Sequence, residues 1–322
     1  MLALLGATVV VMFFVEVLLG SYTVTLPDLL RIVAGADIPG ATFIVMEDKL
    51  PRAVIGLMVG VAFGVSGSIF QTMLRNALAS PDVIGVTSGA SVGAVLAIVV
   101  FSAEGPFVSL WAFVGTLVVA LTIFALARQG GVMGSRLILV GIAIAAVLHS
   151  VVSYLLVRAD VHIAADAFAW LQGSLNNSTW PRARDLAVSL AVLLPVVAGL
   201  AGRLGVLSLG DHTAAGLGVR VNRSRLWLML TGVALAAVAT AAAGPVAFVA
   251  FLSGPIAGRM LGGRVSLAAS GLVGALVVLC ADYVAHNLAP GATLPVGVVT
   301  GALGAPFLIY LLVAANRGGR GG

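Results

Sequence analysis

Long apolar segments, separated by short polar connections, fill most of the chain. A bilayer crossing needs roughly 20 apolar residues, and stretches near that length occur at ten places. The longest run is interrupted at Gly244-Pro245, where a helix should stop or kink, which leaves a rather short second piece. We therefore expect an all-α, polytopic membrane protein of about ten transmembrane helices, with nine or eleven as alternatives, near 2–20, 52–73, 84–102, 107–127, 136–157, 185–202, 226–243, 245–260, 265–286 and 294–315.

The composition excludes a soluble domain. Hydrophobic residues make up 61% of the 322 residues and charged residues only 9%, with a mean hydropathy of +1.16, whereas soluble domains carry about 25% charged residues. The single cysteine, Cys280, lies in an apolar run and is expected to be a small buried side chain. The net charge of +5 is spread among loops, so no nucleic-acid partner is expected.

The basic residues predict an orientation. Residues 203–225 form the longest interval that is polar at both ends. If this interval is cytoplasmic, alternating the segments places eleven Lys and Arg residues inside and six outside, in agreement with the positive-inside rule. Both termini are then expected in the cytoplasm.

The same interval predicts a short helix. Asp211 is a candidate N-cap and Gly218 a candidate C′ residue. Arginines surround the predicted helix at positions 203, 220, 223 and 225. A capped helix with basic flanks at a membrane surface suits docking to a soluble partner, and an ordinary positively charged cytoplasmic loop is the alternative interpretation.

Three runs carry glycine at every fourth position, a spacing that lets another helix approach closely. These runs are Gly56, Gly60 and Gly64; Gly85, Gly89 and Gly93; and Gly254, Gly258 and Gly262.

Few ionisable residues lie inside the predicted spans, where each charge costs about 2.5–3.5 kcal/mol. Glu16 and Asp282 lie near the predicted outer boundary, and His149 lies well inside a span together with Ser150 and Ser153. For His149, an interhelical hydrogen bond and a place on a solute path are both open.

The sequence lacks recognisable catalytic motifs. Its only lysine is Lys49, so the phosphate-binding pattern GxxxxGK[ST] is absent. The pattern GxSxG at Gly89–Gly93 lies inside an apolar span rather than at a strand-to-helix turn. We therefore expect no catalytic residue, no metal site and no cofactor, and active transport would draw its energy from a partner or an ion gradient.

Specific motifs begin at Lys49–Ala94, and others follow in order at Trp170–Ser174, Leu207–Asp211, Gly244–Val249, Leu294–Gly297 and Gly304–Phe307. Together they resemble the permease subunits of ABC importers for iron–siderophores, haem and cobalamin, over nearly the whole chain. The resemblance implies the type II importer permease fold and a single transmembrane domain over 1–322. It also implies a coupling segment at about 203–225 and a place in the bacterial cytoplasmic (inner) membrane.

The resemblance also implies partners and site residues. Such permeases dimerise around a central path within membrane lipid. They bind two ABC ATPase subunits on the cytoplasmic side and one solute-binding protein on the outer side. The docking residues for the binding protein fall on Lys49, Arg52 and His286. Arg52 is expected to matter most, because lysine lacks the planar fork and histidine is largely neutral at pH 7. The ATPase-coupling residues would be Leu209, Gly210, Asp211, Ala214, Ala215, Leu217 and Gly218.

Two further positions follow from the same matching. Gly134 and Ser135 fall where the family narrows its inner gate, although Ser135 could equally be a helix N-cap. Gly254–Arg259 reads GPIAGR where many members read PHIAR, a form associated with one of two non-identical permeases. It indicates a heterodimer.

The leading functional hypothesis is a permease subunit of an ATP-driven importer of ferric siderophores. Haem or cobalamin import is the alternative cargo. An ion-coupled secondary transporter should carry ionisable residues near the midplane, where only His149 comes close, and a membrane-embedded enzyme lacks its motifs. The chelate itself is not identified by the sequence.

Overall fold

The computed structural model describes the chain except residues 21, 83, 128–132, 288–293 and 319–322, and the side chains of 133–135 and 311–318. All regular secondary structure in the described part is helical, and every predicted apolar segment corresponds to a helix. Within the residues that the structure describes, six helices are long and apolar enough to cross a membrane. The helices that correspond to the ten predicted segments are α1 (Leu2–Leu18), α4 (Leu50–Leu74), α5 (Val86–Phe101), α6 (Pro106–Ala127), α7 (Met133–Arg158), α9 (Trp180–Ser208), α11 (Val221–Ala243), α12 (Val249–Met260), α13 (Leu267–Asn287) and α14 (Val296–Gly318).

Short helices that the hydropathy pattern did not predict occupy the connections. Thr25 caps one of them, accepting a hydrogen bond from the Asp28 backbone N–H at 3.3 Å, and Asp160 caps another through the His162 N–H at 3.0 Å. These elements are too short to span a bilayer, so a search for long apolar runs does not find them. They are α2 (Leu26–Val33), α3 (Ala41–Phe43), the π-helix η1 (Ile44–Lys49), α8 (Val161–Leu171) and α10 (Asp211–Gly216).

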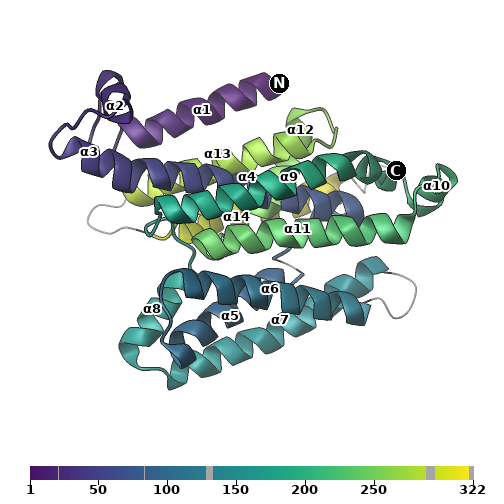
Figure 1. Cartoon of the computed structure of the whole chain (residues 1–322). Coiled ribbons are helices and arrows are strands. Elements are labelled where there is room, and N and C mark those ends of the chain that lie inside the picture. Colours follow the sequence, from purple (N-terminus) through teal and green to yellow (C-terminus); the bar gives the residue numbers. More distant parts are fainter. Residues whose placement is uncertain (21, 83, 128–132, 288–293, 319–322) are drawn as a thin grey trace.

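The helices form two layers, with α5 to α8 in one and the remaining long helices in the other (Figure 1). Helix α4 is central to the larger layer, where it packs against α9, α11, α12 and α13. Its bulky side chains, among them Phe63 and Phe70, are fully buried. This burial explains why α4 is apolar on all sides instead of carrying one apolar stripe.

Two of the three glycine runs make close helix contacts, as predicted. A Cβ on Gly60 or Gly64 of α4 would collide with the backbone of α13, and one on Gly89 or Gly93 of α5 would collide with the backbone of α6. In the third run, a Cβ on Gly254 would meet the Gln71 side chain of α4, but the prediction is wrong for the other two glycines. There, Gly258 and Gly262 face open space, and Gly262 adopts a φ of +64° just after α12 ends.

We expect Gly64→Ala to destabilise the bundle, because its new methyl group would meet the Ser270 carbonyl of α13. Overpacking of this kind costs about 1–3 kcal/mol. Gly199→Ala in α9 is the matched control, since nothing lies within 4 Å of its Cβ position. Thermal unfolding in detergent should show a lower Tm for the first variant only, and equal Tm values would contradict the close approach.

The predicted break at Gly244-Pro245 is confirmed. Helix α11 ends at Ala243, Gly244 has a φ of +72°, and α12 starts only at Val249. The 12 residues of α12 span roughly 18 Å at 1.5 Å per residue, which is less than the hydrocarbon core of about 30 Å. Non-helical backbone at such a depth is tolerated where it is buried in protein or lines a cavity.

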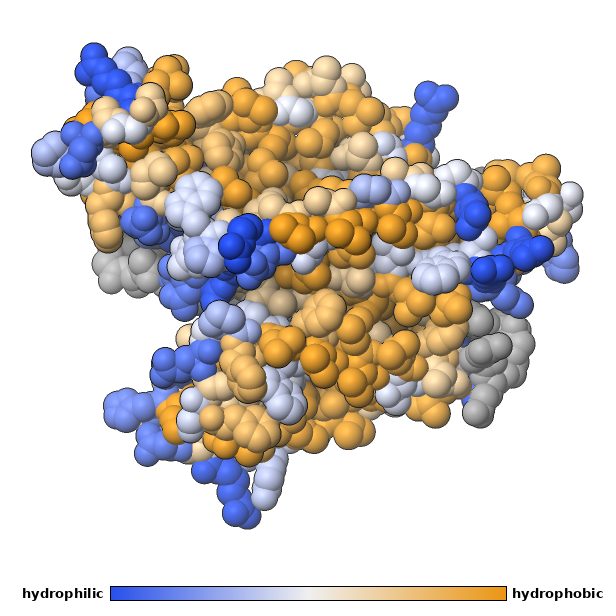
Figure 2. Space-filling model, in the orientation of Figure 1, coloured by the Kyte–Doolittle hydropathy of each residue, from blue (hydrophilic) through white to orange (hydrophobic). Residues whose placement is uncertain are grey.

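The surface shows the pattern of a membrane protein. Hydrophobic side chains cover the middle of the visible face, and hydrophilic side chains gather at its two ends (Figure 2). One end carries α2 and α3, and the other carries α10 (Figure 1). We refer to them as the α2 end and the α10 end.

Candidate functional site

Helix α10 projects from the bundle between α9 and α11 (Figure 1). It closes as predicted at Gly218, which has a φ of +80°. The N–H groups of Gly218 and Val219 donate to the carbonyls of Ala215 and Ala214, each at 3.0 Å, and this pair of bonds is the Schellman motif. The prediction of Asp211 as N-cap is wrong, because Gly210 takes that position and the Asp211 side chain makes no capping bond.

The Asp211 carboxylate instead anchors α10 to the bundle. Arg225 Nη2 of α11 donates to Oδ1 at 3.0 Å and to Oδ2 at 3.2 Å. Arg75, which follows α4, places its Nη2 3.8 Å from Oδ1. The short helix is thereby tied to two long helices, so a force on α10 would reach both.

The outward side of α10 carries two large exposed apolar side chains. Leu209 and Leu217, which flank the helix, are 62% and 61% exposed, and Ala215 and Gly218 are exposed beside them, whereas Ala214 is buried against the bundle. Large exposed apolar side chains at a hydrophilic end of a membrane protein indicate a protein contact. His212 and Thr213 are exposed between the leucines and belong to the same surface. Sequence reasoning omitted these two residues although they lie inside the capped interval.

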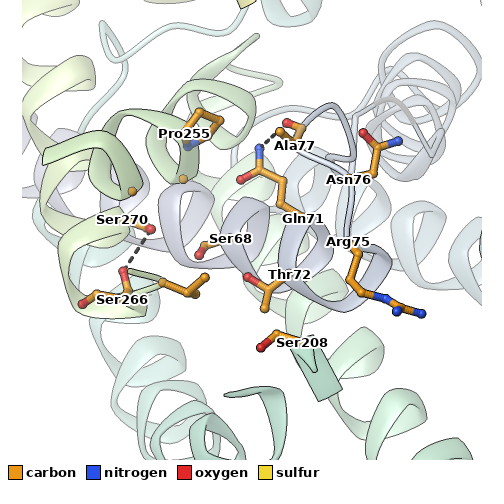
Figure 3. Close-up of a pocket in the computed structure, with 13 residues that line it drawn as sticks. Ser68, Gln71, Thr72, Arg75, Asn76, Ala77, Ser208, Pro255, Ser266 and Ser270 are labelled. Atoms are coloured by element: carbon orange, nitrogen blue, oxygen red, sulfur yellow. Dashed lines mark hydrogen bonds between the residues drawn. The ribbon is translucent and has the colours of Figure 1, made fainter. Parts of the chain in front are cut away.

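A crevice of about 280 Å³ opens beside this surface (Figure 3). Polar side chains of α4 line one wall, and the crevice reaches α10 through Arg75 at its rim. Gln71 Nε2 donates to the Ala77 carbonyl at 3.1 Å and to the Phe251 carbonyl at 2.9 Å, which joins α4 to α12. Gly254 and Gly258 of the third glycine run also line the crevice; a Cβ on Gly254 would meet the Gln71 side chain, whereas Gly258 faces open space.

At the α2 end, a buried ion pair joins α4 to α13. Arg52 Nε lies 2.5 Å from Asp282 Oδ2, and its Nη2 lies 2.8 Å from Oδ1. The two side chains are 6% and 2% exposed. Arg52 Nη1 also lies 3.1 Å from His286 Nδ1. Each of the three guanidinium nitrogens therefore has a partner inside the protein, and the contact with Asp282 has the bidentate geometry that arginine favours.

Lys49 holds the end of α1. Its Nζ donates to the carbonyls of Leu19 and Tyr22 at 2.7 and 2.6 Å, and to that of Val17 at 3.2 Å. The structure thus brings the three predicted docking residues, Lys49, Arg52 and His286, into one cluster. Lys49 and Arg52 are 8% and 5% exposed and bonded internally. Their part in docking stays a prediction.

The sequence did not predict that two acidic residues, Glu16 and Asp282, belong to the same cluster. Asp282 is paired, and Glu16 is buried beside it with Arg52 and Lys49 around one small cavity. Neither carboxylate oxygen of Glu16 has a hydrogen-bond partner in the described part of the chain. The sequence could have indicated this cluster, because an intramembrane carboxylate usually pairs with a cation at the same depth. Arg52 was the candidate cation for such a pair.

The remaining predicted positions are less informative. Gly134 and Ser135 lie at the start of α7, outside the residues whose side chains are described, so the gate stays a prediction. His149 lines a cavity between the two helix layers. Within the described ranges, no group of three or more His, Cys, Asp or Glu side chains could hold a metal ion.

A helical bundle with an apolar middle and hydrophilic ends (Figure 2) has the architecture of a polytopic membrane protein. The chain belongs to the FecCD transport family, which it matches over residues 8–314. The predicted family and the all-α permease fold are confirmed, and the chain is a permease subunit without enzymatic activity of its own.

Known proteins support this assignment. The chain is 43% identical over 277 residues to the ferric enterobactin transport system permease protein FepG of Escherichia coli (strain K12), covering 86% of this chain and 84% of that protein. It is 37% identical over 273 residues to the Fe(3+)-citrate import system permease protein YfmE of Bacillus subtilis (strain 168), covering 84% and 82%. An inward-facing metal-chelate type ABC transporter shares the fold with a TM-score of 0.86 and 26% identity, over 97% of this chain and 98% of that one.

Proposed function

We propose that this chain is the permease subunit of an ATP-driven importer of ferric siderophores. It would form the translocation path with a second, non-identical permease and couple that path to cytoplasmic ABC ATPase subunits. The relatives named for ferric enterobactin and ferric citrate support iron chelates as cargo. Haem and cobalamin are the alternative cargoes.

The proposed orientation places the α10 end in the cytoplasm of a bacterium, with both termini on that side of the inner membrane. Four arginines lie in 203–225, which favours the cytoplasmic side. An extracytoplasmic solute-binding protein would then dock at the α2 end, around Lys49, Arg52 and His286. The inner gate at Gly134 and Ser135 would lie on the cytoplasmic side.

The observation that carries the proposal is the geometry of α10. A short helix with exposed leucines is held by Asp211 against Arg225, as a rigid docking element requires. The ATPase would therefore bind α10.

Co-purification of this chain with its ATPase, the second permease and the binding protein tests the proposed function. We expect a stable complex whose ATP hydrolysis rises with the loaded binding protein and which takes up ⁵⁵Fe-siderophore into proteoliposomes. Haem and cobalamin, offered with the same complex, test the alternative cargoes. Uptake driven by a pH gradient with no ATPase present would instead support the ion-coupled transporter.

A further inference from the structure

A basic pocket of about 450 Å³ lies at the α10 end, between the last turns of α9 and the first turns of α11. Arg203 of α9 lines one side, and Arg220, Arg223 and Trp227 line the other. No acidic side chain is among the described residues that form its walls. We call it the arginine pocket, because it gathers three positive charges without a compensating negative charge.

The three arginines are not used to hold the fold together. Arg203, Arg220 and Arg223 are exposed, and within the described part of the chain they form no ion pair or side-chain hydrogen bond. Their neighbour Arg225, in contrast, is paired with Asp211. Arg220 and Arg223 also lie at the N-terminus of α11, where the helix dipole makes a positive charge unfavourable. A bound anion would remove this electrostatic cost.

The pocket lies where two membrane-spanning helices leave the apolar layer. Both α9 and α11 are long and apolar enough to cross a membrane. Val192 and Val196 of α9 are 63% and 43% exposed. They precede Arg203 by eleven and seven residues, about three and two helical turns, so the three side chains share one face. Apolar side chains exposed on a membrane-spanning helix face lipid, and Arg203 stands at the hydrophilic end of this face (Figure 2).

Trp227 marks the same level on α11. It follows Arg223 by four residues, which places both side chains on one face of the helix, and it is 47% exposed. Tryptophan is enriched where a bilayer meets water, at the depth of the lipid headgroups. The arginine pocket therefore combines cationic side chains with an interfacial aromatic ring.

We propose that the arginine pocket binds the headgroup of an anionic phospholipid. The guanidinium groups donate hydrogen bonds to the phosphate oxygens, and the acyl chains lie along the apolar face of α9. Basic pockets between transmembrane helices recognise anionic headgroups in this way. A zwitterionic headgroup carries its own cation and would leave the arginine charges uncompensated. The proposal requires only that the chain spans a membrane, so it is independent of the cargo.

An acidic surface of the ATPase is the competing occupant, because α10 directly precedes the pocket in the chain. A free phosphate ion would satisfy the same guanidinium groups. Neither of them uses the exposed apolar face that leads along α9 to Arg203, and this face favours a lipid.

The test uses the complete importer in detergent with a phosphatidylglycerol probe that carries a diazirine beside its headgroup. Photo-adducts are mapped by mass spectrometry, and unlabelled phosphatidylglycerol, phosphatidylcholine and glycerol 3-phosphate compete with the probe. Arg203→Gln/Arg223→Gln removes two charges from the pocket. Arg31→Gln/Arg184→Gln is the matched control, because it removes the same charge at the α2 end, where each arginine is exposed and already paired with an acidic side chain.

We expect adducts between residues 203 and 227, displaced about a hundredfold more effectively by phosphatidylglycerol than by phosphatidylcholine, as three basic residues near an anionic headgroup imply. The pocket variant should bind the probe there about thirtyfold more weakly, since two of the three charges are lost. It should also retain the ATPase, and the control should match the wild type.

Three results would overturn the proposal. Equal displacement by phosphatidylcholine would show that the headgroup charge is not recognised, and equal displacement by glycerol 3-phosphate would assign the pocket to a soluble phosphate. A pocket variant that loses the ATPase but keeps its lipid adduct would assign the arginines to the ATPase contact. Iron uptake is not measured in this experiment, so its outcome leaves the proposed function untouched.

Discussion

Arg52→Met should lower the free energy of unfolding by about 3–5 kcal/mol, because it leaves the Asp282 carboxylate buried without its cation. The pair is bidentate, at 2.5 and 2.8 Å, and almost completely buried. Denaturant unfolding in mixed micelles measures the loss. No other cation replaces the guanidinium, because Lys49 is engaged with the carbonyls at the end of α1.

The double variant Arg52→Met/Asp282→Leu is the control for this prediction. Replacing both partners of a buried ion pair by apolar groups is often neutral or stabilising, so most of the lost stability should return. A double variant as unstable as the single one would show that the ion pair is not the cause.

The same double variant also separates the two roles considered for Arg52. If the protein is stable without the ion pair but has lost affinity for the binding protein, Arg52 contributes to docking as the family resemblance implies. Unchanged affinity would assign Arg52 to the interior of the bundle. Surface plasmon resonance on nanodisc-embedded importer makes this comparison.

Replacing the two exposed leucines beside α10 should uncouple the ATPase. Fully burying one leucine side chain stabilises by about 1.5–3 kcal/mol, so Leu209→Glu/Leu217→Glu should weaken binding of the ATPase subunit about a thousandfold. Iron uptake should fall to background while the permease stays folded, since both side chains are more than half exposed. Pull-down of the ATPase by the permease measures the effect.

Leu30→Glu in α2 is the matched control, because Leu30 is 62% exposed at the opposite end. It should leave the ATPase bound. Retention of the ATPase by the α10 variant, or its loss from the α2 variant, would contradict the assignment of the two ends.

Much of the fold could be predicted because each transmembrane helix is a continuous apolar stretch of the sequence. Long apolar runs and the break at Gly244-Pro245 each depend on local residues only, and all correspond to observed features. Helices α2 and α8 were missed because their eight and eleven residues are too short to register as spans. The third glycine run shows the limit of spacing alone, since it does not say whether a partner helix is present.

The sites depended on contacts that the sequence does not display. Arg52 and Asp282 are 230 positions apart, and only the packing of α4 against α13 brings them together. Asp211 was predicted as an N-cap because capping patterns are recognised from neighbouring residues alone. In the structure its carboxylate instead pairs with Arg225 of α11.

Photo-cross-linking from position 212 tests the central claim most directly. With benzoylphenylalanine replacing the exposed His212 of α10, the assembled importer should cross-link to the ATPase subunit. The same probe replacing Phe43, 71% exposed at the α2 end, should not reach it. An ATPase adduct from position 43, or none from position 212 in a complex that hydrolyses ATP, would contradict a permease driven through α10.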